Sequence, residues 1–430
     1  MEQFYLMNKD KKMALVECGA EVVKIVEVYS FFPFMTKMYN NLRFWLVDNR
    51  GIQSDFVGNL KRSCGRNIKD TFWFREVGSE LCWKDVSLFN PENQKDHVLT
   101  KRSLVGPNER FVSNHDGKSW IVKEWSNEER NEGYAEHLAY AVGKKFGVNV
   151  ASCLHSVQDG TLRTETEVFT GDSCIMVTLD EVFDNAPSFF DIFSFFKGLG
   201  ERHLDEFRKL MVFDALIGNT DRNLRNMGIL LNPDTGDLLG VAPSYEHSKS
   251  LLSWVRTEQL VDFEKKLECM YFRWGDPNLV AAFCRTKELE SRLGDMLDFE
   301  FHFNPREHEK ERRDILSSMV QYQAHNILNG IRNGRGPSRK SSLSKVAVED
   351  EIFSLDDKVF VDLVDNHKVH TVLMNSKRTE DGYVLEPVGK EYLLEGDLLE
   401  FKILGIERKK VSTKGIFKVG RRKEIIEYGK

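Results

Sequence analysis

The chain has 430 residues, of which 41% are hydrophobic and 30% charged, and its formal net charge is −6. This length exceeds one ordinary core, so two or three globular domains are expected, and the acidic balance argues against nucleic acid as a partner. The seven cysteines are scattered and include no Cys-x-x-Cys pair, which predicts a reduced, cytoplasmic setting without zinc. No signal-peptide pattern and no apolar run of membrane-spanning length occurs, so no membrane partner is expected.

The first two regions differ in their patterns. Residues 1–98 alternate aromatic patches with polar turns, which predicts a mixed α/β N-terminal extension. Residues 99–190 predict a strand-rich domain in which "RFVSNHDGKSWIVKEW" forms a hairpin around the turn "NHDG". The following "SNEERNEGYAEHLAYAVGKKFGV" has apolar residues at helical spacing, and Ser126 with Glu129 resembles a capping box. A helix that lies on a small sheet is therefore expected here.

Helical patterns dominate residues 191–330. The stretch "LDEFRKLMVFDALIG" repeats its apolar residues every three or four positions and ends at Gly218, a residue that suits a helix C-terminus. It is followed by "NMGILLNPDTGDLLGVAPSY", which predicts two strands joined by a tight turn. Residues 331–349 are rich in Gly, Ser, Arg and Lys and predict a flexible basic linker, whereas residues 350–430 predict a small all-β domain.

Five residues in the middle of the chain suggest a particular chemistry. They are Gly106 in a loop, Lys123 at the end of a strand, Asp221 and Asn226 in "NTDRNLRN", and Glu246 after the hairpin. Phosphoryl transfer from ATP needs a loop that approaches the phosphates closely and a lysine that neutralises their charge. It also needs an acid that orients the attacking hydroxyl, and amide and carboxylate oxygens that hold Mg²⁺. The order of these residue types therefore predicts an ATP- and Mg²⁺-dependent phosphotransferase.

Longer segments resemble a known family. The segment "LMVFDALIGNTDRNLRNMGILLNPDTGDLLGVAPSYEHSKSL" resembles the HipA-like serine/threonine kinases of bacteria, which have a distant likeness to phosphoinositide kinases. That family has an Asp-Arg-His-x-x-Asn block, a hairpin, and then Ala-Pro-x-Phe-Asp-x-Gly-x-Ser-Leu. Upstream, "GKSWIVK" resembles its ATP-lysine strand, and "NEGYAEHLA" resembles the helix whose glutamate pairs with that lysine. The resemblance covers about residues 40–325.

The resemblance implies a role for each matching residue. Lys123 is the nucleotide lysine, Asp221 is the catalytic acid and Asn226 is a metal ligand. Glu132 is expected to pair with Lys123, with Glu136 one helical turn later as the alternative.

Three positions depart from the family pattern. Asn223 stands where the family has His, Glu246 where it has the metal-binding Asp, and Ser248 where it has a small Gly. Glutamate keeps the charge but reaches one methylene further, and a displacement of about 1 Å costs about a hundredfold in rate. Reduced activity, or nucleotide binding without turnover, is therefore an alternative.

Each of these residues also has a purely structural interpretation. In that interpretation, Lys123 is a solvent-exposed lysine at the end of a strand. Asp221 and Asn226 are then residues that form the turn between a helix and a strand. Glu246 is an ordinary surface carboxylate, and Gly106 with Pro107 forms a simple turn. The order of the residues along the chain favours the catalytic interpretation.

The resulting prediction is a bilobal α+β kinase fold. Its N-lobe comprises residues 99–190 and its C-lobe residues 191–330, flanked by the extension, the linker and the small β domain. The predicted activity is ATP- and Mg²⁺- or Mn²⁺-dependent phosphorylation of Ser or Thr in a protein substrate. Autophosphorylation and a toxin or effector role are implied by the resemblance, and the C-terminal β domain is expected to take a protein partner. A scaffolding pseudokinase and a small-molecule or lipid kinase are the alternatives.

Overall fold

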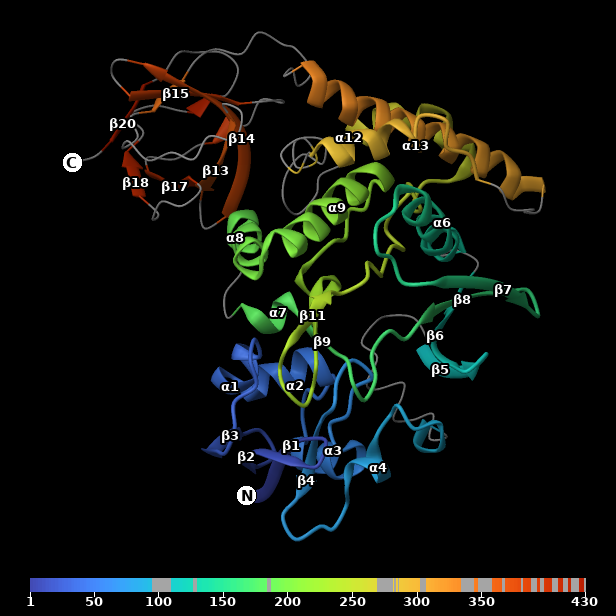
Figure 1. Cartoon of the computed structure of the whole chain (residues 1–430), viewed down its shortest axis with the longest axis vertical. Coiled ribbons are helices and arrows are strands. Elements are labelled where there is room, and N and C mark those ends of the chain that lie inside the picture. The colour runs from blue at the N-terminus through green and yellow to red at the C-terminus, as the bar shows by residue number, and fades with distance from the viewer. Residues whose placement is uncertain are drawn as a thin grey trace. The chain divides into compact units, whose positions relative to one another are not determined.

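A computed structural model describes most of the chain (Figure 1). It describes residues 1–94, 110–126, 130–183, 187–268, 286–301 and 307–333, positions 281 and 284, and the strands of the C-terminal segment. Two compact units result. The first comprises residues 1–186 and 222–254, and the second comprises residues 187–221 and 255–430. Within the part of the chain that the structure describes, none of the helices has both the length and the hydropathy of a transmembrane span.

The N-terminal part of the first unit is an antiparallel sheet with four short helices. The strand order is β3-β2-β1-β4, with β1 (Glu2–Asn8), β2 (Lys11–Cys18), β3 (Val23–Val28) and β4 (Phe72–Glu76). The helices are α1 (Thr36–Asn40), α2 (Leu42–Arg50), α3 (Phe56–Ser63) and α4 (Trp83–Val86), followed by the 3₁₀ turn η1 (Pro91–Gln94). Trp45 of α2 packs on Phe74 of β4, with ring centroids 6.5 Å apart. Several of the aromatic residues that mark this region in the sequence, among them Trp45, Trp73 and Phe74, are thus buried in its core.

A second antiparallel sheet of the first unit has the order β5-β6-β8-β7. Its strands are β5 (Arg110–His115), β6 (Lys118–Trp125), β7 (Cys153–Gln158) and β8 (Thr161–Glu167). The predicted hairpin β5-β6 is confirmed, and Asp116 and Gly117 both have positive φ in its two-residue turn. The predicted helix is also confirmed as α6 (Arg130–Phe146), although Glu129 of the expected capping box lies outside the described residues.

A three-stranded sheet completes the first unit. Its order is β11-β10-β9, with β9 (Ile175–Thr178), β10 (Gly228–Leu231) and β11 (Leu238–Val241). Two short helical elements of the first unit lie between β9 and β10 along the chain, α7 (Leu179–Val182) and η2 (Leu224–Asn226), and residues 187–221 of the second unit separate them in the sequence. The hairpin β10-β11 is the one predicted from the sequence. It therefore places Asn226 just before β10 and Glu246 just after β11.

The second unit contains helices and a barrel. The helical elements are α8 (Phe189–Leu199), α9 (Glu201–Ile217), η3 (Thr257–Asp262), α10 (Phe263–Glu268), α12 (Lys287–Gly294) and α13 (Glu307–Asn333). Phe196 of α8 stacks on Phe207 of α9 at 4.7 Å, and Gln323 of α13 donates a 3.0 Å hydrogen bond to the Ala215 carbonyl of α9. Helix α9 ends at Gly218, whose φ of 60° is left-handed, as the sequence predicts.

The C-terminal segment forms a closed barrel with the order β12-β15-β14-β13-β17-β18-β20. Its strands are β12 (Ser344–Val346), β13 (Lys358–Asp365), β14 (Lys368–Thr379), β15 (Gly382–Pro387), β17 (Leu398–Ile403), β18 (Lys409–Ser412) and β20 (Ile425–Tyr428). A separate pair joins β16 (Leu393–Leu394) and β19 (Phe417–Lys418). The α+β class with an all-β C-terminal segment is confirmed, and the bilobal arrangement stays a prediction.

Candidate active site

Lys123 lies near the end of β6, and its side chain is only 4% exposed. The strand pairs with β5 on one side and β8 on the other, and Lys123 faces Thr164 across the β6-β8 pair. A buried ammonium group is costly unless carboxylates or hydrogen-bond acceptors surround it. The surroundings of Lys123 therefore decide whether it is a structural or a functional lysine.

Glu136 of α6 accepts a hydrogen bond from the Lys123 ammonium group, and its other oxygen accepts one from Thr164 Oγ1 at 3.1 Å. The side chain of Glu136 is as deeply buried as that of Lys123. Close packing of the helix on the sheet makes this contact possible. A Cβ atom at Gly133 would lie 2.7 Å from side-chain atoms of Trp125 and Leu162, so the helix needs glycine at this position.

Glu132 does not pair with Lys123, and this prediction is corrected in favour of Glu136. Glu132 accepts instead from Lys249 in the segment after β11. The two glutamates are four residues apart, so they lie on one face of α6 and are about 6 Å apart along its axis. Each therefore reaches a different lysine, which the sequence spacing alone does not reveal.

Glu246 also contacts Lys123, with Oε2 2.9 Å from Nζ. Its side chain is 23% exposed, so part of the carboxylate is accessible to solvent. The backbone φ of Glu246 is 58°, a left-handed conformation that costs about 1 kcal/mol or more for a residue other than glycine. Such strain is often found at functional sites, where the surrounding structure holds it in place.

Arg222 joins the two segments that carry Asn226 and Glu246. Its buried guanidinium donates to the Asn226 carbonyl at 2.7 Å and to the Tyr245 carbonyl at 3.0 Å. It also donates to Ser244 Oγ at 2.9 Å. Because Arg222 is the Arg of the Asp-Arg-x-x-x-Asn block, the block's arginine fixes the backbone on both sides of the site. The sequence comparison assigned it no such role.

Ser244 and His247 support the same segment. Ser244 Oγ lies 2.7 Å from His247 Nε2, and the Ser244 backbone forms hydrogen bonds with Asn149 and Ala151. Burial, followed by the charge of Arg222, holds the pKa of His247 well below its ordinary range. His247 is therefore a neutral structural residue at neutral pH.

The remaining predicted residues are placed as follows. Asn226 is the last residue of η2, and its carbonyl is held by Arg222. Asp221 is exposed, and its amide donates to Asn219 Oδ1 at 3.2 Å. It belongs to the second unit, so its convergence with Lys123 and Glu246 stays a prediction. Gly106 lies outside the described residues.

The charges around Lys123 fit a site for a hard cation. Lys123, Glu136 and Glu246 carry one positive and two negative charges, so this trio has a net charge of −1. The described residues contain no group of three or more His, Cys, Asp or Glu that could hold a metal alone. Mg²⁺ is commonly bound by one or two carboxylates together with phosphate oxygens and water. Glu246 and Asn226 have side-chain oxygens of the type that such a site uses, and their role as metal ligands stays a prediction.

Comparison with known proteins shows which family the central region resembles. The model of the HipA-like C-terminal domain matches residues 94–273, which include Lys123, Glu136, Asp221, Asn226 and Glu246. This part of the chain is HipA-like. The resemblance inferred from the sequence is thus confirmed.

Two solved structures are similar to this chain at low identity. One is the proinflammatory kinase CtkA of Helicobacter pylori, at 14% identity over 54% of this chain and 92% of that chain, with a TM-score of 0.41. The other is the complex of HipA and HipB of Shewanella oneidensis MR-1 with operator DNA, at 12% identity over 77% of this chain and 99% of that chain, with a TM-score of 0.47. Comparison with curated proteins finds no match. The likeness of residues 94–273 to the family therefore depends on the match to the family model.

Proposed function

We propose that the protein is an ATP-dependent kinase that transfers the γ-phosphoryl group to a Ser or Thr hydroxyl of a protein. The observation that supports this most strongly is the buried Lys123, which lies between Glu136 of the helix and Glu246 of the segment after the hairpin. Kinases use such a lysine to hold phosphates and a helix glutamate to orient the lysine. The partly exposed Glu246 adds an oxygen ligand at the same place.

In the proposed reaction, Lys123 holds the α- and β-phosphates of ATP, and Glu136 keeps its ammonium group in position. Asp221 orients the acceptor hydroxyl and takes its proton. The bond between the γ-phosphorus and the β-γ bridging oxygen breaks as the bond to the hydroxyl oxygen forms, and ADP leaves. Asn226 and Glu246 would hold Mg²⁺ or Mn²⁺, which neutralises charge on the phosphates.

The geometry of Glu246 favours one alternative function. Glu246 pairs with Lys123 at 2.9 Å, so a metal that takes this carboxylate must compete with the ion pair. Together with Asn223 in place of the family's His, this supports a pseudokinase that binds nucleotide and acts as a scaffold. The family resemblance alone supports autophosphorylation, a toxin or effector role and, for the barrel, a protein partner. The free cysteines among the described residues fit a cytoplasmic location.

Incubation of the purified protein with γ-labelled ATP and Mg²⁺ or Mn²⁺ tests the proposal. Asp221→Asn should lower label incorporation by about 100-fold or more, because it removes the group that accepts the proton. Asp298→Asn, at an exposed aspartate of the same unit, should leave incorporation unchanged. Mass spectrometry of the labelled product identifies the acceptor residue.

Three results would decide against the proposal. Incorporation that survives in Asp221→Asn contradicts the role of this residue. A nucleotide-dependent melting shift without incorporation in the wild type supports the pseudokinase. Label on a small molecule or lipid instead of Ser or Thr assigns a different acceptor class.

A further inference from the structure

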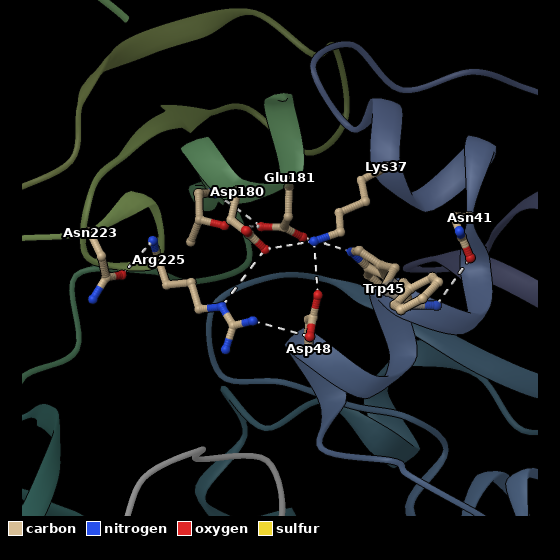
Figure 2. A network of polar contacts seen from close by, with 10 residues as sticks. Lys37, Asn41, Trp45, Asp48, Asp180, Glu181, Asn223 and Arg225 are labelled. Carbon is tan, nitrogen blue, oxygen red and sulfur yellow. Dashed lines mark hydrogen bonds and ion pairs between the residues drawn. The ribbon is translucent and has the colours of Figure 1, made fainter. Parts of the chain in front are cut away.

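A ring of four charged side chains connects the N-terminal helices to the loop that contains Asn226 (Figure 2). Lys37 of α1 lies 2.8 Å from Asp48 of α2 and 2.9 Å from Asp180 of α7. Arg225 of η2 contacts the same two carboxylates, at 3.1 Å from Asp48 and 3.8 Å from Asp180. Positive and negative groups alternate around the ring, so its charges balance.

Three of the four side chains are largely buried. The side chains of Lys37, Asp48 and Asp180 are between 16% and 20% exposed, whereas that of Arg225 is 50% exposed. Burial lowers the pKa of Lys37, but hydrogen bonds to Asp48 and Asp180 outweigh it and leave the pKa above its ordinary value. Lys37 therefore stays charged, and the ring is less screened by solvent than a surface ion pair.

The helices behind the ring are firmly joined to each other. Trp45 Nε1 of α2 donates to the buried Glu181 of α7 at 2.7 Å. Glu181 also accepts hydrogen bonds from the amide and the hydroxyl of Thr178, each at 3.0 Å, which caps α7. The carboxylates of Asp48 and Asp180 are thus presented from a fixed frame.

Arg225 is linked to both candidate metal ligands. It directly precedes Asn226, and its carbonyl accepts a 2.5 Å hydrogen bond from the hydroxyl of Tyr245. Tyr245 directly precedes Glu246. A hydrogen bond of 2.9 Å from the Arg225 amide to Asn223 Oδ1 fixes the start of this turn.

We propose that Asp48 and Asp180 are positioning residues that act through Arg225 to set the places of Asn226 and Glu246. The N-terminal helices α1 and α2 then belong to the machinery of the site. This inference rests on the proposed function for the role of the two ligands, while the positioning itself is a property of the fold. Small displacements matter here, because about 1 Å at a reacting centre costs about a hundredfold in rate.

Asp48→Asn tests the proposal, because it removes one negative charge from the ring with little change in shape. The matched control is Asp234→Asn. Asp234 pairs with Lys9 at 2.7 Å and so joins the N-terminal sheet to the same hairpin, but in the turn beyond the far end of β10. Asp48→Glu keeps the charge and should rescue the effect.

Hydrogen exchange of backbone amides is the first measurement. In Asp48→Asn, exchange in residues 223–227 and 243–248 should become about tenfold faster, because these segments open more readily. The control and Asp48→Glu should exchange like the wild type. Unchanged exchange in Asp48→Asn overturns the proposal, and so does an equal increase in the control. An increase spread over the whole first unit, including β5 and β6, assigns Asp48 to general stability and also overturns it.

Nucleotide binding is the second measurement, with Mn²⁺ titrated against fluorescent ADP. Loss of the positioning residue should raise the half-saturating Mn²⁺ concentration about tenfold, an effect typical of residues that orient metal ligands. If the wild-type protein binds no nucleotide, the proposed function is contradicted. The hydrogen-exchange result then still decides whether Asp48 positions the segments that carry Asn226 and Glu246. Metal-dependent binding that is unchanged in Asp48→Asn overturns the proposal.

Discussion

Two buried ion-pair sites in the first unit have similar burial but different composition. Arg50 and Asp70 form a two-pronged pair, with both N–O distances 2.8 Å and side chains 1% and 4% exposed. Lys123 instead lies between two carboxylates, Glu136 and Glu246, of which the second is 23% exposed. The first pair balances its own charges and has matching geometry, whereas the second site has an excess of negative charge and one carboxylate that is partly accessible to solvent.

Under the proposed function, this difference distinguishes a structural ion pair at Arg50 from a ligand-binding site at Lys123. A bidentate Arg–carboxylate pair occupies both carboxylate oxygens and leaves little for a ligand to contact. A lysine that pairs with two carboxylates can give up one of them when a charged ligand binds, because the other carboxylate remains as its partner. If this distinction is correct, substitutions at the two sites should separate stability from ligand binding.

The largest effect on stability is expected for Arg50→Met. It leaves the carboxylate of Asp70 buried without its charged partner, so the free energy of unfolding should fall by about 3 to 5 kcal/mol. Urea denaturation measures this loss. The control Arg62→Met breaks an exposed pair with Asp55, with side chains 56% and 61% exposed, and should change stability by less than about 1 kcal/mol. Similar losses of unfolding free energy in both variants would show that burial of an ion pair does not determine its contribution to stability.

Glu246→Gln should have the opposite effect to Arg50→Met, with stability nearly unchanged and ligand binding weakened. Glu136 remains to pair with Lys123, so the free energy of unfolding should change by less than about 1 kcal/mol. Binding of ADP with Mn²⁺ should weaken about tenfold, because a neutral amide is a poorer ligand for a hard cation. Thermal melting with and without ADP and Mn²⁺ measures both quantities. A loss of stability like that of Arg50→Met would make Glu246 a structural residue and remove the contrast between the sites.

The smallest effect concerns pH and the helix behind Lys123. His137 of α6 contacts the Cys153 carbonyl of β7 at 2.8 Å, and burial, followed by the charge of His155, lowers its pKa below the ordinary 6.5. The unfolded chain therefore binds the proton more readily, so stability should fall as the pH drops below about 6.5, with a slope of up to about 1.4 kcal/mol per pH unit. Urea denaturation between about pH 5 and about pH 7 should show a shallower slope for His137→Gln. An identical slope would exclude His137 as its source.

Part of the candidate site could be predicted from the sequence. The order of Lys123, a helix glutamate and Glu246 indicated a contact that the structure shows, because this order is typical of the family. The choice between Glu132 and Glu136 depended on how closely α6 approaches the sheet at Gly133, which is a packing property. The left-handed backbone of Glu246 was equally beyond prediction, since glutamate does not favour it.

The fold shows the same division between local and long-range features. The two hairpins and the C-terminus of α9 followed from turn residues such as Asp116-Gly117 and Gly218. The role of the N-terminal helices did not, because Lys37 and Asp48 are ordinary helix residues and their partner Asp180 is more than a hundred positions away. No spacing rule connects such distant residues.

The way the C-terminal barrel closes has a practical consequence for handling this protein. Strand β20 (Ile425–Tyr428) pairs in parallel with β12 and in antiparallel fashion with β18, so it closes the barrel between these two strands. Proteolytic removal of β20 would leave unpaired backbone groups on β12 and β18. Exposed strand edges of this kind pair with strands of neighbouring molecules. Preparations cleaved before Ile425 should therefore aggregate, even though the HipA-like region of the chain is intact.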